Sequence, residues 1–134
     1  MKIPDRVRYV NKKFTNRLMI RIAGKRHSPI VLLEHKGRYS GKYYRIPLLA
    51  QKFNDGFMFA LTYGTQVDWY KNVLAAGWAR LTCRGIRYEL SAPVIVETAV
   101  GQNSFTFPKG QILHVIGIRD FFFMKADTLM LEGD

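Results

Sequence analysis

The chain has 134 residues, of which 48% are hydrophobic and 23% charged, and its formal net charge is +11. This composition is typical of one globular domain and excludes a disordered chain, and no apolar run approaches the roughly 20 residues that span a bilayer. Residues 1–45 contain 13 Lys and Arg and two acidic residues, whereas residues 46–134 hold eight of each sign. A one-sided charge of this kind attracts polyanions, whether a nucleic acid, an anionic membrane or a phosphorylated cofactor, and charge alone does not choose among them.

The first predicted element is an amphipathic helix over residues 1–24. Pro4 and Asp5 suit a first helical turn, Gly24 suits its end, and apolar residues recur between them at three- and four-residue steps: Ile3, Val7, Val10, Phe14, Leu18 and Ile22. The other faces are basic, so the helix either packs on the rest of the chain or lies on a membrane surface. The N-terminus lacks the pattern of a secretory signal, and we therefore expect the protein in the cytoplasm, with attachment to the inner face of the membrane through residues 1–24 left open.

Extended segments follow the helix. The run 30–33 has the β-branched content of a buried strand, and residues 36–42 form a predicted loop. Residues 43–53 are expected to be extended, with Pro47 marking an edge or a bulge because proline cannot donate to a strand ladder. The turn-forming residues 54–56 then predict a hairpin into a strand over residues 57–62.

The second half of the chain predicts two short helices and further strands. Thr65 with Asp68 fits a capping box for a helix that ends at Gly77. Strands are expected over residues 78–83 and 86–90, with an extended continuation over 93–98, a helix from Pro108 to Gly117, and a last strand near residues 121–125. The predicted fold is one domain over residues 1–134, mainly β with short helices: a β-barrel over residues 29–126 with helical additions.

Residues 36–45, which cover the predicted loop and the start of the extended segment, are basic and contain two glycines. This pattern is suited to binding an anion. Glycine exposes backbone N–H groups, and Arg side chains match phosphate oxygens in pairs. The spacing differs from that of a Walker phosphate loop, which needs four residues between its glycines and a helix after it. A solvated basic turn is the alternative. The candidate binding residues are Arg38, Tyr39, Ser40, Gly41, Lys42, Arg45 and Pro47.

Residues 61–72 join a strand end, a glycine turn and a helix start that is rich in planar side chains. Free amides at a helix start hydrogen-bond carbonyl or phosphate oxygens, and a glycine lets the backbone lie against a flat ring. The alternative is that Asp68 only caps the helix and Trp69 only fills the core. The candidate binding residues are Thr62, Tyr63, Gly64, Asp68, Trp69 and Asn72.

The sequence lacks the residues that several other kinds of active site require. The single cysteine and the three separated histidines do not make a zinc site, so we expect no metal, and the sequence shows neither a close carboxylate pair nor a Gly-x-Ser-x-Gly elbow. If the protein is an enzyme, a bound cofactor supplies most of the reactivity. We assign no catalytic residue.

Taken together, these motifs resemble the deazaflavin-dependent nitroreductase family. The resemblance rests on residues 37–41 (Gly-Arg-Tyr-Ser-Gly), residues 45–47 (Arg-Ile-Pro), Tyr63 with Gly64, and residues 68–72 (Asp-Trp-Tyr-Lys-Asn). It covers about residues 30–125 and implies a split β-barrel of the FMN-binding type. Tyr39 departs from the family pattern, in which a basic residue is usual.

The resemblance implies an oxidoreductase that passes a hydride from reduced deazaflavin coenzyme F-420 to a small organic acceptor, such as a quinone or a nitro compound. It implies that the phosphate and acidic tail lie near Arg38 and Arg45, and the ring near Tyr63, Gly64 and Trp69. Alternatives are an FMN-dependent oxidoreductase on the same barrel, or a basic module that binds a membrane or nucleic-acid surface without catalysis. For the enzyme we expect no nucleic-acid partner, and a homodimer is left open.

Overall fold

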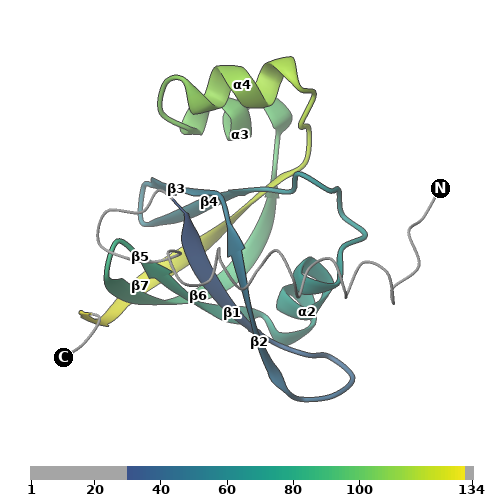
Figure 1. The fold of residues 1–134 in the computed structure, drawn as a ribbon, viewed down its shortest axis with the longest axis vertical. Coiled ribbons are helices and arrows are strands. Elements are labelled where there is room, and N and C mark those ends of the chain that lie inside the picture. Colours follow the sequence, from purple (N-terminus) through teal and green to yellow (C-terminus); the bar gives the residue numbers. More distant parts are fainter. Residues whose placement is uncertain (1–29, 132–134) are drawn as a thin grey trace.

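The computed structural model describes residues 30–131, with side chains through residue 127. The helix predicted over residues 1–24 lies outside the described residues. Within them, the chain forms seven strands and three short helices (Figure 1). The strands are β1 (Val31–Lys36), β2 (Tyr43–Leu48), β3 (Ala50–Phe53), β4 (Gly56–Ala60), β5 (Trp78–Cys83), β6 (Ile86–Val96) and β7 (Phe121–Leu131), and the helices are α2 (Asp68–Ala76), α3 (Thr98–Ser104) and α4 (Lys109–Val115).

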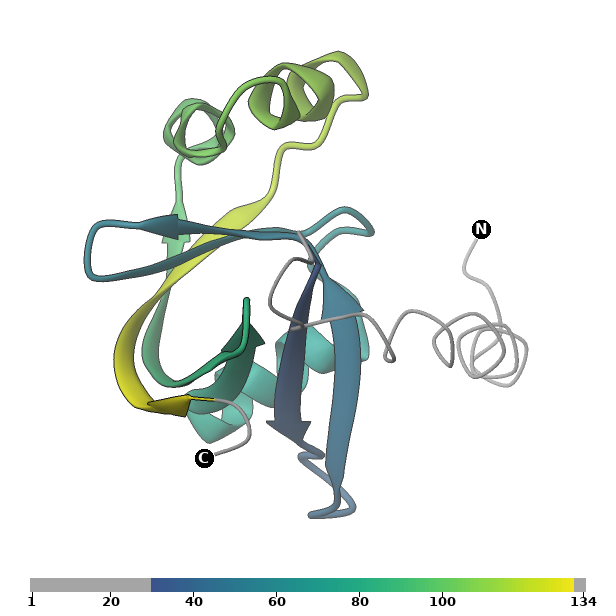
Figure 2. The same cartoon turned by 60° about the vertical axis from the view of Figure 1, so that its left-hand side comes forward.

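The seven strands form one antiparallel sheet in the order β2-β1-β5-β6-β7-β4-β3. Its two outer strands are consecutive in the chain, because only Leu49 separates β2 from β3. The segment 43–53 pairs with β1 through its first half and with β4 through its second half, so it closes the curled sheet into a barrel (Figures 1 and 2). This is the predicted split β-barrel. Pro47 lies in β2, which pairs with β1 alone, and its missing N–H therefore breaks no second ladder.

The barrel interior is filled by alternate residues of the strands. Val31 and Leu33 point inward from β1, Phe57 and Phe59 from β4, and they join Leu81, Leu90 and Met124 in one buried cluster. Helix α2 completes this cluster with Trp69, Tyr70 and Val73, and the ring of Tyr70 lies 4.9 Å from that of Phe122. Helix α2 is therefore held in place by the main core, and its first turn has a fixed position relative to the barrel.

A second, smaller core lies beneath α3 and α4. Phe105 and Leu113 pack there against Met58, Ala60 and Phe121 of the sheet. Helix α3 was not predicted, because its seven residues include a glycine and it has no side-chain cap. Packing stabilises it instead: Gly101 is buried directly against the ring of Phe121.

The other boundaries follow the predictions with three differences. The capping box is wrong, because α2 begins at Asp68 after Val67, which makes no side-chain cap. Strand β6 runs without a break from Ile86 to Val96, through a bulge near Ala92, and β7 extends to Leu131. Gly77 ends α2 in a left-handed conformation, as expected. Among the described residues, none of the helices has the length and apolar character needed to cross a membrane.

We expect Gly101→Ala to destabilise the protein by about 1–3 kcal/mol, because the added Cβ would overlap Cβ and Cγ of Phe121, and overpacked cores lose stability on this scale. The measurement is the free energy of unfolding in urea. The control is Val100→Ala, the same helix and an exposed side chain, which should change stability by no more than about 0.5 kcal/mol. Equal stabilities for the two variants would show that α3 is not packed as described.

Candidate functional site

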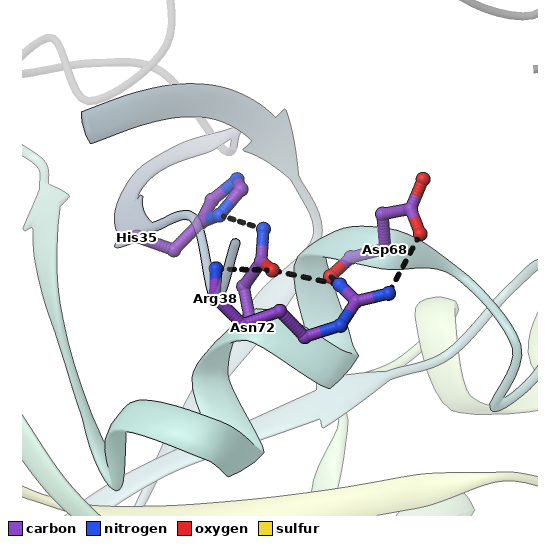
Figure 3. Close-up of polar contacts among 4 residues, drawn as sticks. All are labelled: His35, Arg38, Asp68 and Asn72. Carbon is purple, nitrogen blue, oxygen red and sulfur yellow. Dashed lines mark hydrogen bonds and ion pairs between the residues drawn. The ribbon is translucent and has the colours of Figure 1, made fainter. Parts of the chain in front are cut away.

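The two candidate segments meet at one end of the barrel, where the loop between β1 and β2 lies against the first turns of α2 (Figure 3). Arg38 makes the connection. Its Nη1 donates to Oδ1 of Asn72 at 2.8 Å and to the carbonyl oxygen of Asp68 at 3.4 Å, and its Nη2 forms an ion pair with Oδ1 of Asp68 at 3.3 Å. The two candidate segments therefore lie in contact, and Arg38 and Asn72 hold them together.

Asn72 is the buried centre of this contact. Its Oδ1 also accepts the backbone N–H of Arg38 at 3.1 Å, and its Nδ2 lies 3.2 Å from Nδ1 of His35 (Figure 3). His35 is buried on the inner face of β1, in alternation with Val31 and Leu33. No role was predicted for His35. That alternation was the signal that could have placed its ring inside the barrel.

The backbone of the loop is already hydrogen-bonded within the chain. The N–H of Gly37 donates to the carbonyl of Lys42 at 2.7 Å, that of Gly41 to Gly37 at 3.0 Å, and that of Lys42 to Oγ of Ser40 at 3.2 Å. With the N–H of Arg38 bonded to Asn72, four amides of this loop are occupied. The expectation that the glycines expose these N–H groups to an anion is therefore wrong.

The glycines allow the loop to adopt its tight conformation. A Cβ on Gly37 would lie 2.6 Å from Oγ of Ser40 and 2.8 Å from the ring of Tyr44, and Gly41 has a φ of 71°. The hydroxyl of Tyr44 is 3.0 Å from Oγ of Ser40, and its ring stacks on His35 with centroids 5.8 Å apart. Recognition of an anion is left to side chains.

Four cationic side chains stand on or beside this loop. Lys36, Lys42 and Arg45 are exposed, whereas Arg38 is only 20% exposed. Burial acts to lower the pKa of Arg38, but hydrogen bonds and charge from Tyr39 and Asp68 outweigh it and raise this pKa, so the guanidinium stays charged. The exposed ring of Tyr39 lies 4.6 Å from that guanidinium. Arg45 sits opposite Glu34 in the β1–β2 register.

Of the residues predicted to face a ring, some are exposed and others are buried. Thr62 and Tyr63 are exposed, and Gly64, at a φ of 84°, has open space where a Cβ would be. Trp69 is 7% exposed and lies in the core, 5.8 Å from the ring of Phe122. Pro47 is half-buried farther along β2, away from the loop.

The two contacts of Arg38 should differ in strength, and a double-mutant cycle separates them. The side chain of Asp68 is 54% exposed, so we expect its coupling to Arg38 to stay below about 1 kcal/mol and to shrink with salt. Asn72 is buried and accepts a charge-assisted bond, so its coupling to Arg38 should be about 1.5–3 kcal/mol. The cycles use Arg38→Ala with Asp68→Ala or with Asn72→Ala, and compare free energies of unfolding. A larger coupling to Asp68 than to Asn72 would contradict this description.

No family model and no curated protein matches this chain. Among solved structures, a protein described as a domain-swapped dimer is 18% identical with a TM-score of 0.53, covering 89% of this chain and 98% of its own. A candidate 5-nitroimidazole antibiotic resistance protein from Bacteroides thetaiotaomicron is 8% identical with a TM-score of 0.51, covering 83% and 79%. An F-420 reductase is 12% identical with a TM-score of 0.49, covering 80% and 91%. The first two similarities establish the fold, so this chain has the split β-barrel of the family that its motifs resemble.

Proposed function

We propose that this protein is an oxidoreductase that binds deazaflavin coenzyme F-420 and passes a hydride from its reduced form to an organic acceptor such as a quinone or a nitro compound. One observation carries the proposal: the loop after β1 and the start of α2, which hold the family-like motifs, are joined into one site by Arg38 and Asn72. Two segments about 30 residues apart in the chain thus meet at one end of the barrel.

The cationic side of the site suits the phosphate and the acidic tail of the coenzyme. Lys42 and Arg45 are exposed. Arg38, by contrast, is hydrogen-bonded to Asn72. Charges at a surface act over about 10 Å at 0.1 M salt, so both side chains can attract a polyanion without a fixed geometry. We assign Lys42 and Arg45 to the anion, and Arg38 to the positioning of the loop.

The other side of the site suits a flat ring with carbonyl oxygens. The first turn of a helix has N–H groups without intrahelical acceptors, and Val67 gives α2 no side-chain cap. The left-handed Gly64 and the exposed ring of Tyr63 stand immediately before it. Trp69 supports this side from within the core, where it fixes the direction of α2.

The coenzyme, when bound, supplies the hydride, and the protein needs only to hold the donor and acceptor carbons about 3–3.5 Å apart and to exclude water. A proton must also reach the reduced acceptor. The hydroxyls of Tyr44 and Tyr63 are the candidate donors, together with water. Tyr44 is oriented by Ser40, whereas Tyr63 projects into solvent.

The deciding experiment is a parallel titration of the full chain with oxidised F-420, reduced F-420 and FMN, followed by ligand fluorescence. We expect both forms of F-420 to bind and FMN to bind more weakly. Tighter binding of FMN would replace the proposed cofactor while retaining the site. Failure of both cofactors to bind would end the proposal.

Charge-removal variants test the assigned contacts. We expect Lys42→Ala and Arg45→Ala each to weaken F-420 binding about three- to tenfold, with a smaller effect at high salt, because exposed charges are screened. Lys52→Ala is the matched control, since it removes an exposed cation from the far end of the same extended segment 43–53. If neither variant differs from the control, the anion does not bind beside this loop.

A further inference from the structure

His35 is a buried titratable side chain that has no role in the proposed reaction. It is 6% exposed and lies on the inner face of β1, where its ring stacks on that of Tyr44. Its Nδ1 lies 3.2 Å from Nδ2 of Asn72, which is also 6% exposed (Figure 3). A polar pair at this depth needs one donor and one acceptor, so the protonation of the ring is tied to the orientation of the amide.

The orientation of the Asn72 amide is set by Arg38. The backbone N–H and Nη1 of Arg38 both donate to Oδ1 of Asn72, at 3.1 and 2.8 Å. Neither group of Arg38 can accept a hydrogen bond, so the amide oxygen must face Arg38 and the amide NH2 must face the imidazole. This NH2 is only a donor. Nδ1 of His35 is therefore the acceptor, and the ring is neutral with its proton on Nε2.

Protonation of His35 conflicts with this arrangement. An imidazolium has an N–H at both nitrogens, so Nδ1 would point a hydrogen at the NH2 of Asn72. Turning the amide over would give the ring an acceptor, but it would then point the NH2 at the two donors of Arg38. In either orientation buried donors are left without acceptors, and the contact between the β1–β2 loop and α2 is weakened.

Among the described residues, three segments present charged or titratable groups to this network. β2 contributes the phenol of Tyr44, whose ring stacks on that of His35. The loop contributes Arg38, and α2 contributes Asp68, whose carboxylate is paired with Nη2 of Arg38 at 3.3 Å. Arg80 of β5 is paired with the residue of β1 before His35, so it belongs to the opposite face of the sheet. The charged group in contact with the amide is Arg38, and it disfavours a second positive charge on the ring.

We propose that His35 is a positioning residue of the candidate site, which in its neutral Nε2–H form orients Asn72 and thereby holds Arg38 and the β1–β2 loop against α2. Histidine ordinarily titrates at about pH 6.5, so the contact is complete at neutral pH and is lost as the pH falls below this value. The attached loop binds one proton fewer than the detached loop, so the ratio of the two forms changes by up to about tenfold for each pH unit.

The same equilibrium should govern ligand binding. A coenzyme that contacts both segments binds the form in which the loop is attached, so its affinity falls in acid together with the contact. This step rests on the proposed function, whereas the role of His35 in holding the loop does not.

Nitrogen-15 NMR of the imidazole rings tests the tautomer without any ligand. At neutral pH we expect the ring of His35 to have its proton on Nε2 and none on Nδ1. The His35 signals are those that disappear in His35→Asn. A proton on Nδ1 of the unaltered protein at neutral pH would overturn the proposal.

Hydrogen exchange of the Arg38 backbone amide measures the contact itself, because this N–H is bonded to Asn72. In the unaltered protein its protection factor should fall by up to about tenfold for each pH unit below about pH 6.5. In His35→Asn an amide oxygen replaces Nδ1 as the acceptor and does not titrate, so protection should be independent of pH. In Asn72→Asp the second carboxylate oxygen accepts from an Nδ1–H, so the neutral ring should change tautomer and acid should no longer reduce protection.

The matched control is His114→Asn, which removes an exposed histidine whose Nδ1 contacts Gln102 near α4. This variant should show the same loss of Arg38 protection in acid as the unaltered protein. A loss that persists unchanged in His35→Asn, or an Asn72→Asp protein that loses protection like the unaltered one, overturns the proposal. Should His35→Asn fail to fold, the tautomer of the unaltered protein and the response of Asn72→Asp decide.

Titration with oxidised F-420 over the same pH range separates this role from the proposed function. Relative to His35→Asn, the dissociation constant of the unaltered protein should rise in acid by up to about tenfold for each pH unit. The comparison with the variant removes any titration of the coenzyme itself. Failure of F-420 to bind at any pH ends the proposed function and leaves the NMR and exchange results to decide the role of His35. Equal pH dependence in the two proteins, with the loss of Arg38 protection present, overturns the link to coenzyme binding alone.

Discussion

The hydrogen bonds of one buried amide hold the candidate site together. Asn72 faces His35 on β1 with its nitrogen, and with its oxygen it accepts both the backbone and the guanidinium of Arg38. Breaking such a contact leaves polar groups unpaired in a protein interior, which costs more than the bond itself contributes. Moving the loop after β1 away from α2 therefore costs free energy, because Arg38 and Asn72 would lose these bonds. Any ligand that needs both segments finds them already assembled.

The barrel explains why this arrangement is rigid. Segment 43–53 forms both outer strands of the sheet and pairs with β1 and with β4, so the strand that leaves the candidate loop is also the strand that closes the barrel. Helix α2 is fixed from the other side, because Trp69, Tyr70 and Val73 are part of the main core. Both halves of the site are thus anchored in the same hydrophobic cluster. Only short loops connect the site residues to the elements that are packed in that cluster.

Local patterns predicted most of the barrel, and tertiary contacts account for what they missed. The strand at residues 30–33, the edge position of Pro47 and the turn at residues 54–56 could be predicted because each depends on neighbours in the chain. Helix α3 could not be predicted in this way, because it is stabilised by the packing of Gly101 on Phe121, which lies about 20 residues away in the chain. In the site, the motifs located both segments, but they could not show that the loop amides bond to the chain itself. They also left Trp69 undecided between ligand and core, and the structure places its ring in the core.

The two ends of the molecule differ in what they can contact, and the difference follows from the distribution of charge. The end with the candidate loop and α2 exposes Lys36, Lys42 and Arg45, which attract anions. The end with α3 and α4 exposes aliphatic side chains and one formally charged residue between positions 98 and 118. The barrel separates these two ends, so an anion bound beside the β1–β2 loop would lie far from the exposed aliphatic side chains of α3 and α4 (Figures 1 and 2).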